Sequence, residues 1–271
     1  MSNLLVRIVT GIAYGGSIIA GLMLGKISST LLFLAIMIVA LSEFYSIVEN
    51  DNTKTQRILG YLLSIGIFFS SYLFFVDVEQ SQLLINLCLL LSLCIFSIEL
   101  FTKKELNFNN IALTLTGVIY IALPLSLTIF LNHNSINEYD YSLLLAIFIL
   151  IWLSDTGGYF VGMKFGKHKL HETISPKKSW EGVLGGLLFN IVGSFILSLF
   201  MHAFNTIEWM AIGSVVCLAS VIGDLVESYL KRSVGVKDSG RILPGHGGML
   251  DRIDSALFVI PTVYIFINLI Q

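Results

Sequence analysis

SLLLAIFILIWLSDTGGYFV, residues 142–161, is an almost unbroken apolar run, and runs of this kind decide the fold. A helix needs about 20 consecutive apolar residues to cross the hydrocarbon core of a bilayer, and this run has that length. Similar runs lie at 4–24, 31–48, 58–76, 83–101, 111–131, 183–203, 209–229 and 254–270. We therefore expect an all-α integral membrane protein, a polytopic bundle of about nine transmembrane helices.

The bulk composition is typical of the same class. Of the 271 residues, 55% are hydrophobic and 13% are charged, whereas a soluble domain has about 45–50% apolar and about 25% charged residues. The net charge of −2 does not indicate a partner, and we expect none among nucleic acids. Cys88, Cys94 and Cys217 lie in apolar runs without a metal-ligand spacing, which argues against disulfide and zinc sites. We expect the first run to be a retained helix rather than a cleaved signal peptide.

The basic residues are distributed unevenly between the two sides of this bundle. Nine spans place four loops on the side of the N-terminus: 49–57, 102–110, 162–182 and 230–253. Fifteen of the sixteen Lys and Arg residues lie on that side, and Lys26 is the exception. Because loops rich in Lys and Arg stay in the cytoplasm, we expect the N-terminus and these four loops to be cytoplasmic.

Polar residues become frequent only after residue 150. We therefore expect residues 1–140, with about five helices, to be a transmembrane scaffold. Residues 141–271 are expected to be the functional, catalytic region, which includes the cytoplasmic loops 162–182 and 230–253.

The first polar motif is SDTGGYFVGMKFGKH, residues 154–168. Asp155 lies inside an apolar span, where a carboxylate costs roughly 2.5–3.5 kcal/mol on insertion scales and usually faces a cavity, a cation or a partner. Gly157, Gly158 and Gly162 permit close approach of a second helix or of a ligand. Both interpretations remain open: a helix-packing face with a hydrogen-bonded Asp, or a functional site.

The second motif is SPKKSWEG, residues 175–182. Ser179 is expected to cap the following helix. Lys177 and Lys178 precede a tryptophan at interfacial depth. They are expected either to anchor the chain beside anionic headgroups or to bind a phosphate.

The third motif begins at Gly223 and holds two pairs of carboxylates at i, i+3 spacing. Asp224 and Glu227 lie in an apolar span, repel each other and need a compensating cation. Asp251 and Asp254 repeat the spacing at the start of the last span, where Asp254 is expected to be the N-cap.

Basic residues and glycines surround these carboxylates. The basic residues are Lys231, Arg232, Lys237, Arg241 and Arg252, and the glycines are Gly245, Gly247 and Gly248. Carboxylates suit Mg²⁺, which binds through one or two of them plus substrate phosphates, while Arg, Lys and backbone N–H groups bind anions. The pattern predicts phosphoryl or nucleotidyl transfer at the membrane surface, between a lipid and a soluble anion.

The same residues resemble a known family. Ser228-Tyr-Leu-Lys231-Arg232, then Lys237-Asp238, then PGHGGMLDRID at residues 244–254 are similar to the C-terminal motif of the phosphatidate cytidylyltransferases (CDP-diacylglycerol synthases). SDTGGYFVG and SPKKSWEG also resemble segments of that family, in the same order. The resemblance is strong over about residues 150–260 and only topological before that.

The resemblance implies roles for particular residues. Asp224 and Asp251 would hold the metal, with Asp155, Glu227 and Asp254 as second candidates. The catalytic residues would be Asp224, Lys237, Asp238, His246, Asp251 and Arg252. The residues that bind substrate or phosphate would be Lys177, Lys178, Ser228, Lys231, Arg232, Gly247 and Gly248. His246 by itself is more often a structural hydrogen-bonding residue than a base.

The resemblance also implies the reaction, cofactors and partners. The reaction would be CTP + phosphatidate → CDP-diacylglycerol + diphosphate, with Mg²⁺ and a monovalent cation such as K⁺. The protein would be a multi-pass homodimer in the inner (plasma) membrane, with its active site facing the cytoplasm. The alternatives are a cytidylyltransferase for another lipid phosphate, an ion or phosphate transporter built on the intramembrane carboxylates, and a non-catalytic scaffold.

Overall fold

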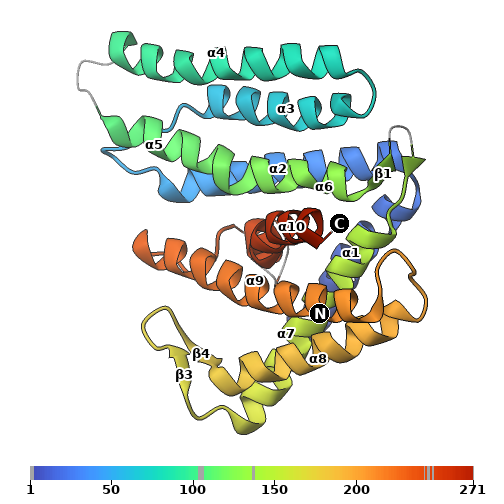
Figure 1. Ribbon diagram of the computed structural model, residues 1–271. Coiled ribbons are helices and arrows are strands. Elements are labelled where there is room, and N and C mark those ends of the chain that lie inside the picture. Colours follow the sequence, from blue (N-terminus) through green and yellow to red (C-terminus); the bar gives the residue numbers. More distant parts are fainter. Residues whose placement is uncertain are drawn as a thin grey trace. The chain divides into compact units, whose positions relative to one another are not determined.

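A computed structural model of the chain describes residues 3–102, 107–135, 138–240, 242, 245 and 247–270. Within these residues every long element is a helix, as Figure 1 shows. The helices are α1 (Asn3–Met23), α2 (Lys26–Val48), α3 (Arg57–Phe74), α4 (Val78–Thr102), α5 (Phe108–Gly117), the π-helix η1 (Val118–Ala122), α6 (Leu123–Leu131), α7 (Ser142–Phe165), α8 (Trp180–Ser198), α9 (Thr206–Ser233) and α10 (Leu250–Ile270). The strands in this part of the chain form two antiparallel hairpins, β1 (His133–Ser135) with β2 (Glu138–Tyr139), and β3 (Lys169–His171) with β4 (Ser175–Ser179).

The helices coincide with the predicted spans when α5, η1 and α6 are taken as one segment. Over the described residues, eight helical segments are long and apolar enough to cross a membrane, and the apolar part of α1, Val9–Met23, is shorter. The prediction of an all-α polytopic membrane protein is confirmed.

A proline explains the irregular segment in the middle of the fifth span. Pro124 has no N–H to donate to the carbonyl of Tyr120, four residues earlier, and its ring crowds that carbonyl. The helix widens there into η1, where the N–H of Leu123 donates to the carbonyl of Val118, five residues earlier. The apolar segment therefore continues through the proline without breaking.

The chain forms two compact units. Unit 1 comprises Met1–Tyr141 and Asp238–Arg252, and unit 2 comprises Ser142–Lys237 and Ile253–Gln271. The segment 238–252 thus packs with the N-terminal helices, although it follows them by about a hundred residues in the chain. The division of the chain into a scaffold and a catalytic region stays a prediction.

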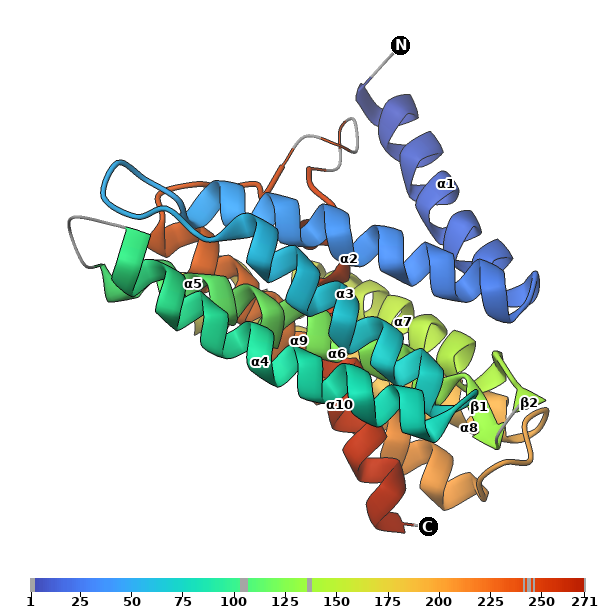
Figure 2. The same cartoon turned by 90° about the horizontal axis from the view of Figure 1, so that it is seen from above.

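In unit 1 the helix α2 is in contact with α1, α3, α5, η1 and α6. Figure 2 shows α3 and α4 side by side, and α2 packs against α3 and α5. The hydroxyl of the buried Tyr45 on α2 donates to the carbonyl of Thr114, at 3.0 Å. A Cβ on Gly60 or Gly117 would collide with the Tyr45 side chain, at 2.3 Å and 2.7 Å. These contacts fix the C-terminal half of α2 in its unit.

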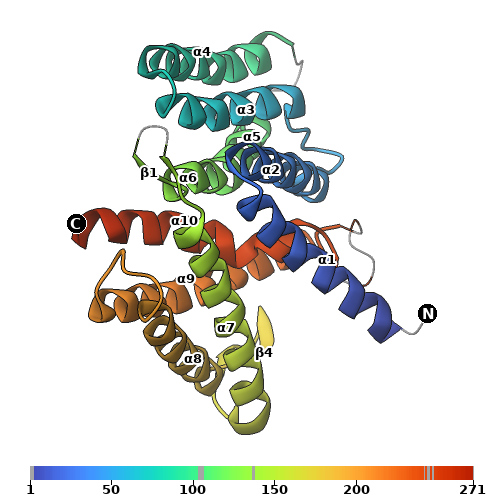
Figure 3. The same cartoon turned by 90° about the vertical axis from the view of Figure 1, so that its right-hand side faces the viewer.

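Unit 2 contains α7, α8, α9 and the part of α10 from Ile253 onward, and α8 is in contact with both α7 and α9. Figure 3 shows α7 and α8 side by side. The β3–β4 hairpin connects the end of α7 to the start of α8. The predicted loop 162–182 is therefore largely ordered as a hairpin.

One helix boundary corrects a prediction. Asp254 was expected to be the N-cap of the last span, but α10 begins at Leu250, so Asp254 lies inside the helix. The N–H groups of Met249 and Leu250 donate to the Glu43 side chain, at 3.0 Å and 2.8 Å. Because the first N–H groups of a helix need such acceptors, Glu43 permits the helix to start at Leu250, five residues before the start that an N-cap at Asp254 would give.

Candidate functional site

The glycines of the first two motifs bring α7 and α8 into close contact. A Cβ on Gly182 would lie 2.9 Å from the carbonyl oxygen of Gly158, and a Cβ on Gly185 would lie 2.9 Å from that of Gly157. Such distances are too short for a side chain, so the two backbones touch only because glycine is present. The helix-packing interpretation of the first motif is thus supported at Gly157, whereas Gly158 and Gly162 would meet their neighbours at ordinary distances and Asp155 is exposed.

The hairpin after α7 holds the second motif in place. The N–H of Gly182 donates to the Ser179 hydroxyl, at 3.2 Å, so Ser179 caps α8 as predicted. Glu181 accepts the N–H groups of Lys167 and His168, and its carboxylate lies 2.6 Å from the His168 ring nitrogen Nδ1. The two ends of the hairpin are thereby tied together, which fixes β4 and its lysines at the start of α8.

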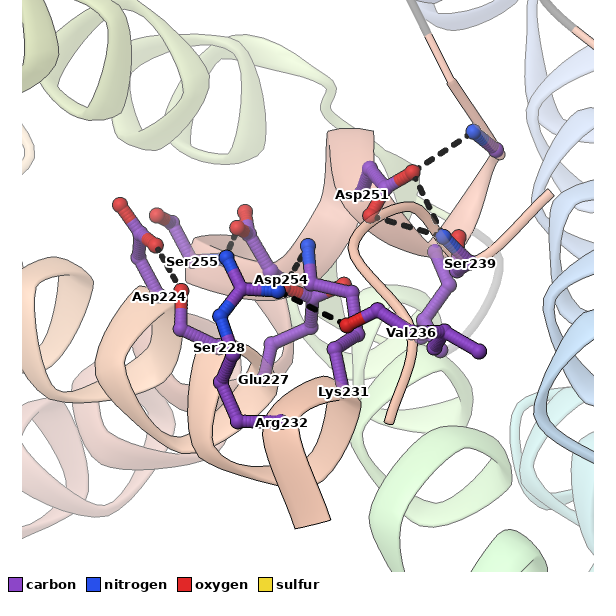
Figure 4. Close-up of polar contacts among 12 residues, drawn as sticks. Asp224, Glu227, Ser228, Lys231, Arg232, Val236, Ser239, Asp251, Asp254 and Ser255 are labelled. Carbon is purple, nitrogen blue, oxygen red and sulfur yellow. Dashed lines mark hydrogen bonds and ion pairs between the residues drawn. The ribbon is translucent and has the colours of Figure 1, made fainter. Parts of the chain in front are cut away.

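The second and third motifs meet in an ion pair within unit 2. Lys178 Nζ on β4 lies 2.6 Å from Asp224 Oδ2 on α9, and both side chains are partly exposed. The Ser228 hydroxyl donates to the other Asp224 oxygen at 3.3 Å, as Figure 4 shows. Asp224 therefore keeps a charged partner and a neutral donor while remaining accessible.

This ion pair borders a cavity of about 580 Å³. The cavity is lined by residues of all three motifs: Ser154, Asp155, Gly158, Tyr159, Gly162 and Met163 from the first, Pro176, Lys177, Lys178, Ser179 and Gly182 from the second, and Asp224 from the third. Lys169, Val183, Gly186 and Val221 complete the lining. Motifs that are separated by tens of residues in the chain thus share one cavity.

The lining combines two kinds of surface. Asp155, Asp224 and three lysines supply charge, whereas Tyr159 and Met163 supply apolar contact. Sites of this kind bind ligands through a mostly apolar wall with a few polar groups that fix orientation. Lysines give point charges for phosphate oxygens, so the cavity suits an anionic ligand that also has an apolar part.

The second intramembrane carboxylate also has its cation. Glu227 is fully buried, and Lys231 Nζ lies 2.5 Å from its Oε2. The predicted need for a compensating cation is met for both carboxylates, by Lys178 at Asp224 and by Lys231 at Glu227. A buried pair of this kind is costly to break because removal of one partner leaves a charge in the interior.

A third carboxylate of unit 2 lies near the cavity. Asp254 on α10 is within electrostatic range of Asp155, Asp224 and Lys178. Its Oδ1 accepts the N–H of Ser255, at 2.6 Å. Asp254 therefore adds a carboxylate of α10 to the same unit as the Lys178–Asp224 ion pair.

Asp251 belongs to unit 1, where it organises the segment 238–252. Its carboxylate accepts the N–H groups of Ser239 at 3.0 Å and Gly248 at 2.7 Å, as Figure 4 shows for Ser239. Gly247 has φ +87°, and a Cβ there would lie 2.5 Å from Asp251 Oδ2. Two of the glycines predicted to bind anions, Gly247 and Gly248, thus already lie against one carboxylate.

The remaining charged residues predicted for the site are exposed wherever the structure describes them. Lys177, Arg232, Lys237, Asp238 and Arg252 are exposed. The Arg232 guanidinium donates to the carbonyl of Val236 at 2.8 Å, which ties the end of α9 to the segment that follows. His246 and Arg241 lie outside the described residues.

The donor set of unit 2 fits a hard cation held together with a substrate. Among the residues that the structure describes, no group of three or more His, Cys, Asp or Glu side chains forms a ready-made metal cage. Asp155 and Asp224 nevertheless present carboxylates to one cavity, and Mg²⁺ binds through one or two carboxylates plus phosphates. Asp224 and Asp251 belong to different units, so a metal shared by these two residues stays a prediction.

The sequence reasoning missed Glu43. This residue lies on α2 with 6% of its surface exposed and accepts three hydrogen bonds from the segment 238–252. The signal was present, because Glu43 is a carboxylate inside the apolar run 31–48. The rule that singled out Asp155 applies to it equally.

Comparison with known proteins gives a consistent result. A model of the cytidylyltransferase family matches residues 5–270. The phosphatidate cytidylyltransferases of Staphylococcus aureus strain COL and of Staphylococcus saprophyticus are each 38% identical to this chain over 179 residues. The corresponding protein of Staphylococcus epidermidis is 38% identical over 178 residues. Each alignment covers 65% of this chain and 66% of the relative, just under two thirds of its length.

Proposed function

The chain belongs to the cytidylyltransferase family, and on that premise we propose that it transfers the cytidylyl group of CTP to phosphatidate, giving CDP-diacylglycerol and diphosphate. The observation that carries the proposal is the cavity of unit 2, where two carboxylates and three lysines meet an apolar wall. Such a lining fits a lipid phosphate and a nucleoside triphosphate, and the printed names of the relatives agree with these substrates.

The reaction requires neutralisation of charge more than covalent catalysis. A phosphate oxygen of phosphatidate attacks the α-phosphorus of CTP, a new P–O bond forms, and the bond to the β-phosphate breaks with its electron pair leaving on diphosphate. Phosphate monoesters are largely ionised near pH 7, so no general base is needed. Lys177 and Lys178 hold phosphate oxygens at the cavity, and the exposed Arg232 and Lys237 of the same unit supply further positive charge. The family resemblance implies the same role for Arg252.

The cavity is also the proposed place of the metal. Asp224 would hold Mg²⁺ there, and Asp155 of the same lining is a second candidate, as are Glu227 and Asp254 of unit 2. Asp251 of unit 1 stays the other principal ligand that the family resemblance implies. When bound, the ion neutralises the developing negative charge on the phosphates. We further propose a monovalent cation such as K⁺, on the family resemblance.

The proposal includes the setting of the enzyme. The eight membrane-length helices support a multi-pass protein of a lipid bilayer. The excess of Lys and Arg on one side supports a cytoplasmic site, in the inner membrane of a bacterial cell. A homodimer is proposed from the family resemblance.

The test uses purified protein in detergent, CTP radiolabelled at the α-phosphorus, and a panel of lipid phosphates. Phosphatidate is expected to be the best acceptor, whereas labelling of only a polyprenyl phosphate would refute this substrate. Lys178→Gln should lower the rate by about 100-fold or more, because its charge lies at the cavity. Lys164→Gln removes the same charge from an exposed site on α7 outside the lining and should leave the rate near wild type.

A further inference from the structure

Glu43 is a nearly buried carboxylate of α2 that contacts the segment 238–252. Its Oε2 accepts the Ser239 hydroxyl at 3.1 Å and the N–H of Leu250 at 2.8 Å. Its Oε1 accepts the N–H of Met249 at 3.0 Å. Three hydrogen-bond donors that lie about 200 residues later in the chain therefore converge on the Glu43 carboxylate.

Two glycines make this approach possible. A Cβ on Gly240 would lie 2.4 Å from Glu43 Oε1, and a Cβ on Gly248 would lie 2.4 Å from Oε2. Any side chain at either position would push the carboxylate away. The chain thus approaches Glu43 closely at two places, Gly240 and Gly248.

Glu43 is linked to Asp251 through one residue. Ser239 donates its hydroxyl to Glu43 and its N–H to Asp251, at 3.1 Å and 3.0 Å. Glu43 also binds the N–H groups at the start of α10, the helix that carries Asp251. A negative charge at a helix N-terminus is favoured by the helix dipole as well as by the free N–H groups. The position of Asp251 therefore depends on Glu43 in two ways, through Ser239 and through the start of α10.

We infer that Glu43 is a positioning residue that holds the segment 238–252 in the conformation in which Asp251 serves the proposed reaction. The inference rests on the proposed function for its catalytic consequence, but the contact itself does not. It gives the N-terminal part of the chain, expected to be scaffold, a role in holding a predicted metal ligand in place. Residues that orient a metal ligand typically alter metal affinity or activity by about 10- to 100-fold when replaced.

Glu43→Gln is the sharpest variant. Three donors surround two carboxylate oxygens, and an amide replaces one of these acceptors by an NH₂ donor of nearly the same size. At least one of the Ser239, Met249 or Leu250 donors then loses its acceptor. Glu99→Gln is the matched control, because Glu99 is also buried in unit 1 but accepts from Asn110 and Gln56 instead.

The first measurement is hydrogen–deuterium exchange of the purified full-length protein in detergent, without substrate. Glu43→Gln should speed amide exchange at Met249 and Leu250 by about tenfold or more, and Glu99→Gln should leave these amides as in wild type. Unchanged exchange in Glu43→Gln would overturn the inference. Ser239→Ala, which removes only the hydroxyl, gives the same test with a smaller change if Glu43→Gln folds poorly.

The second measurement is the Mg²⁺ concentration that gives half of the maximal CTP-transfer rate. It should rise by about tenfold or more in Glu43→Gln and stay at the wild-type value in Glu99→Gln. An equal effect of both variants would mean a general loss of stability and would overturn the positioning role. If the wild type transfers nothing from CTP, the proposed function fails, and the exchange experiment alone then supports or overturns the role of Glu43 in holding the segment.

Discussion

Gly182→Ala is expected to damage the α7–α8 contact beneath the cavity, whereas Gly158→Ala at the same contact is not. A Cβ on Gly182 would lie 2.9 Å from the Gly158 carbonyl oxygen and 3.4 Å from the Gly162 Cα. Both are backbone atoms and cannot rotate away. A Cβ on Gly158 would meet the Gly182 carbonyl oxygen at 3.5 Å, which is an ordinary contact.

These distances set the expected magnitudes. The Gly182→Ala methyl requires the two helices to move apart by about half an ångström, and overpacking of this kind costs about 1–3 kcal/mol. Alanine regains at most about 1 kcal/mol in a helix relative to glycine. Gly182→Ala should therefore lose up to about 3 kcal/mol of stability, and Gly158→Ala should gain up to about 1 kcal/mol.

The assay compares thermal unfolding and initial CTP-transfer rates of both variants in the same detergent. Gly182→Ala should unfold at a lower temperature and work more slowly, because Gly182 also lines the cavity. Gly158→Ala should match or exceed the wild type in stability. Equal unfolding temperatures for the two variants, or a less stable Gly158→Ala, would refute the close backbone contact as the reason for these glycines.

Three further predictions concern charged groups. Asp251→Asn should lower the CTP-transfer rate by about 100-fold or more, equivalent to about 2.7 kcal/mol of transition-state stabilisation, and a near-normal rate would contradict its assignment as a metal ligand. In a double-mutant cycle, Lys178→Gln and Asp224→Asn should show a coupling of about 1 kcal/mol or less in the free energy of unfolding, because both side chains are partly exposed. Their effects on the CTP-transfer rate should be strongly non-additive. Additive effects on the rate would argue that the two residues do not act together. The hydrogen bond from Arg57 lowers the pKa of the Glu49 carboxyl. The ionised Glu49 therefore stabilises the folded state above its unfolded pKa of about 4.3, and this stabilisation is lost as the pH falls through the lower pKa of the folded state. The destabilisation by Glu49→Gln should accordingly fade below about pH 4, and a pH-independent difference in unfolding temperature would contradict this.

The helices could be predicted because membrane-length apolar runs leave the backbone few other choices. A span must satisfy its own N–H and carbonyl groups, so length and composition are sufficient to place it. The ends were harder to place. The start of α10 depends on Glu43, more than 200 residues earlier in the chain, and no local pattern around Asp254 contains that information.

The sequence predicted which types of residue form the candidate site better than it predicted which residues they contact. The spacing of Asp224 and Glu227 indicated a need for cations, and the structure supplies Lys178 and Lys231. Lys231 follows from helical periodicity, because it lies four residues after Glu227. Lys178 comes from another motif, and its contact with Asp224 depends on how β4 and α9 pack, which the sequence does not state.

The most direct test of the central claim follows both ends of the nucleotide in one reaction. The purified protein is given phosphatidate, Mg²⁺ and CTP radiolabelled either at the α-phosphorus or at the γ-phosphorus. The account predicts that the α label enters the lipid and the γ label leaves as diphosphate in equal amounts, and that Asp224→Asn stops both. Label in the lipid from γ-labelled CTP, or equal rates for the wild type and Asp224→Asn, would contradict it.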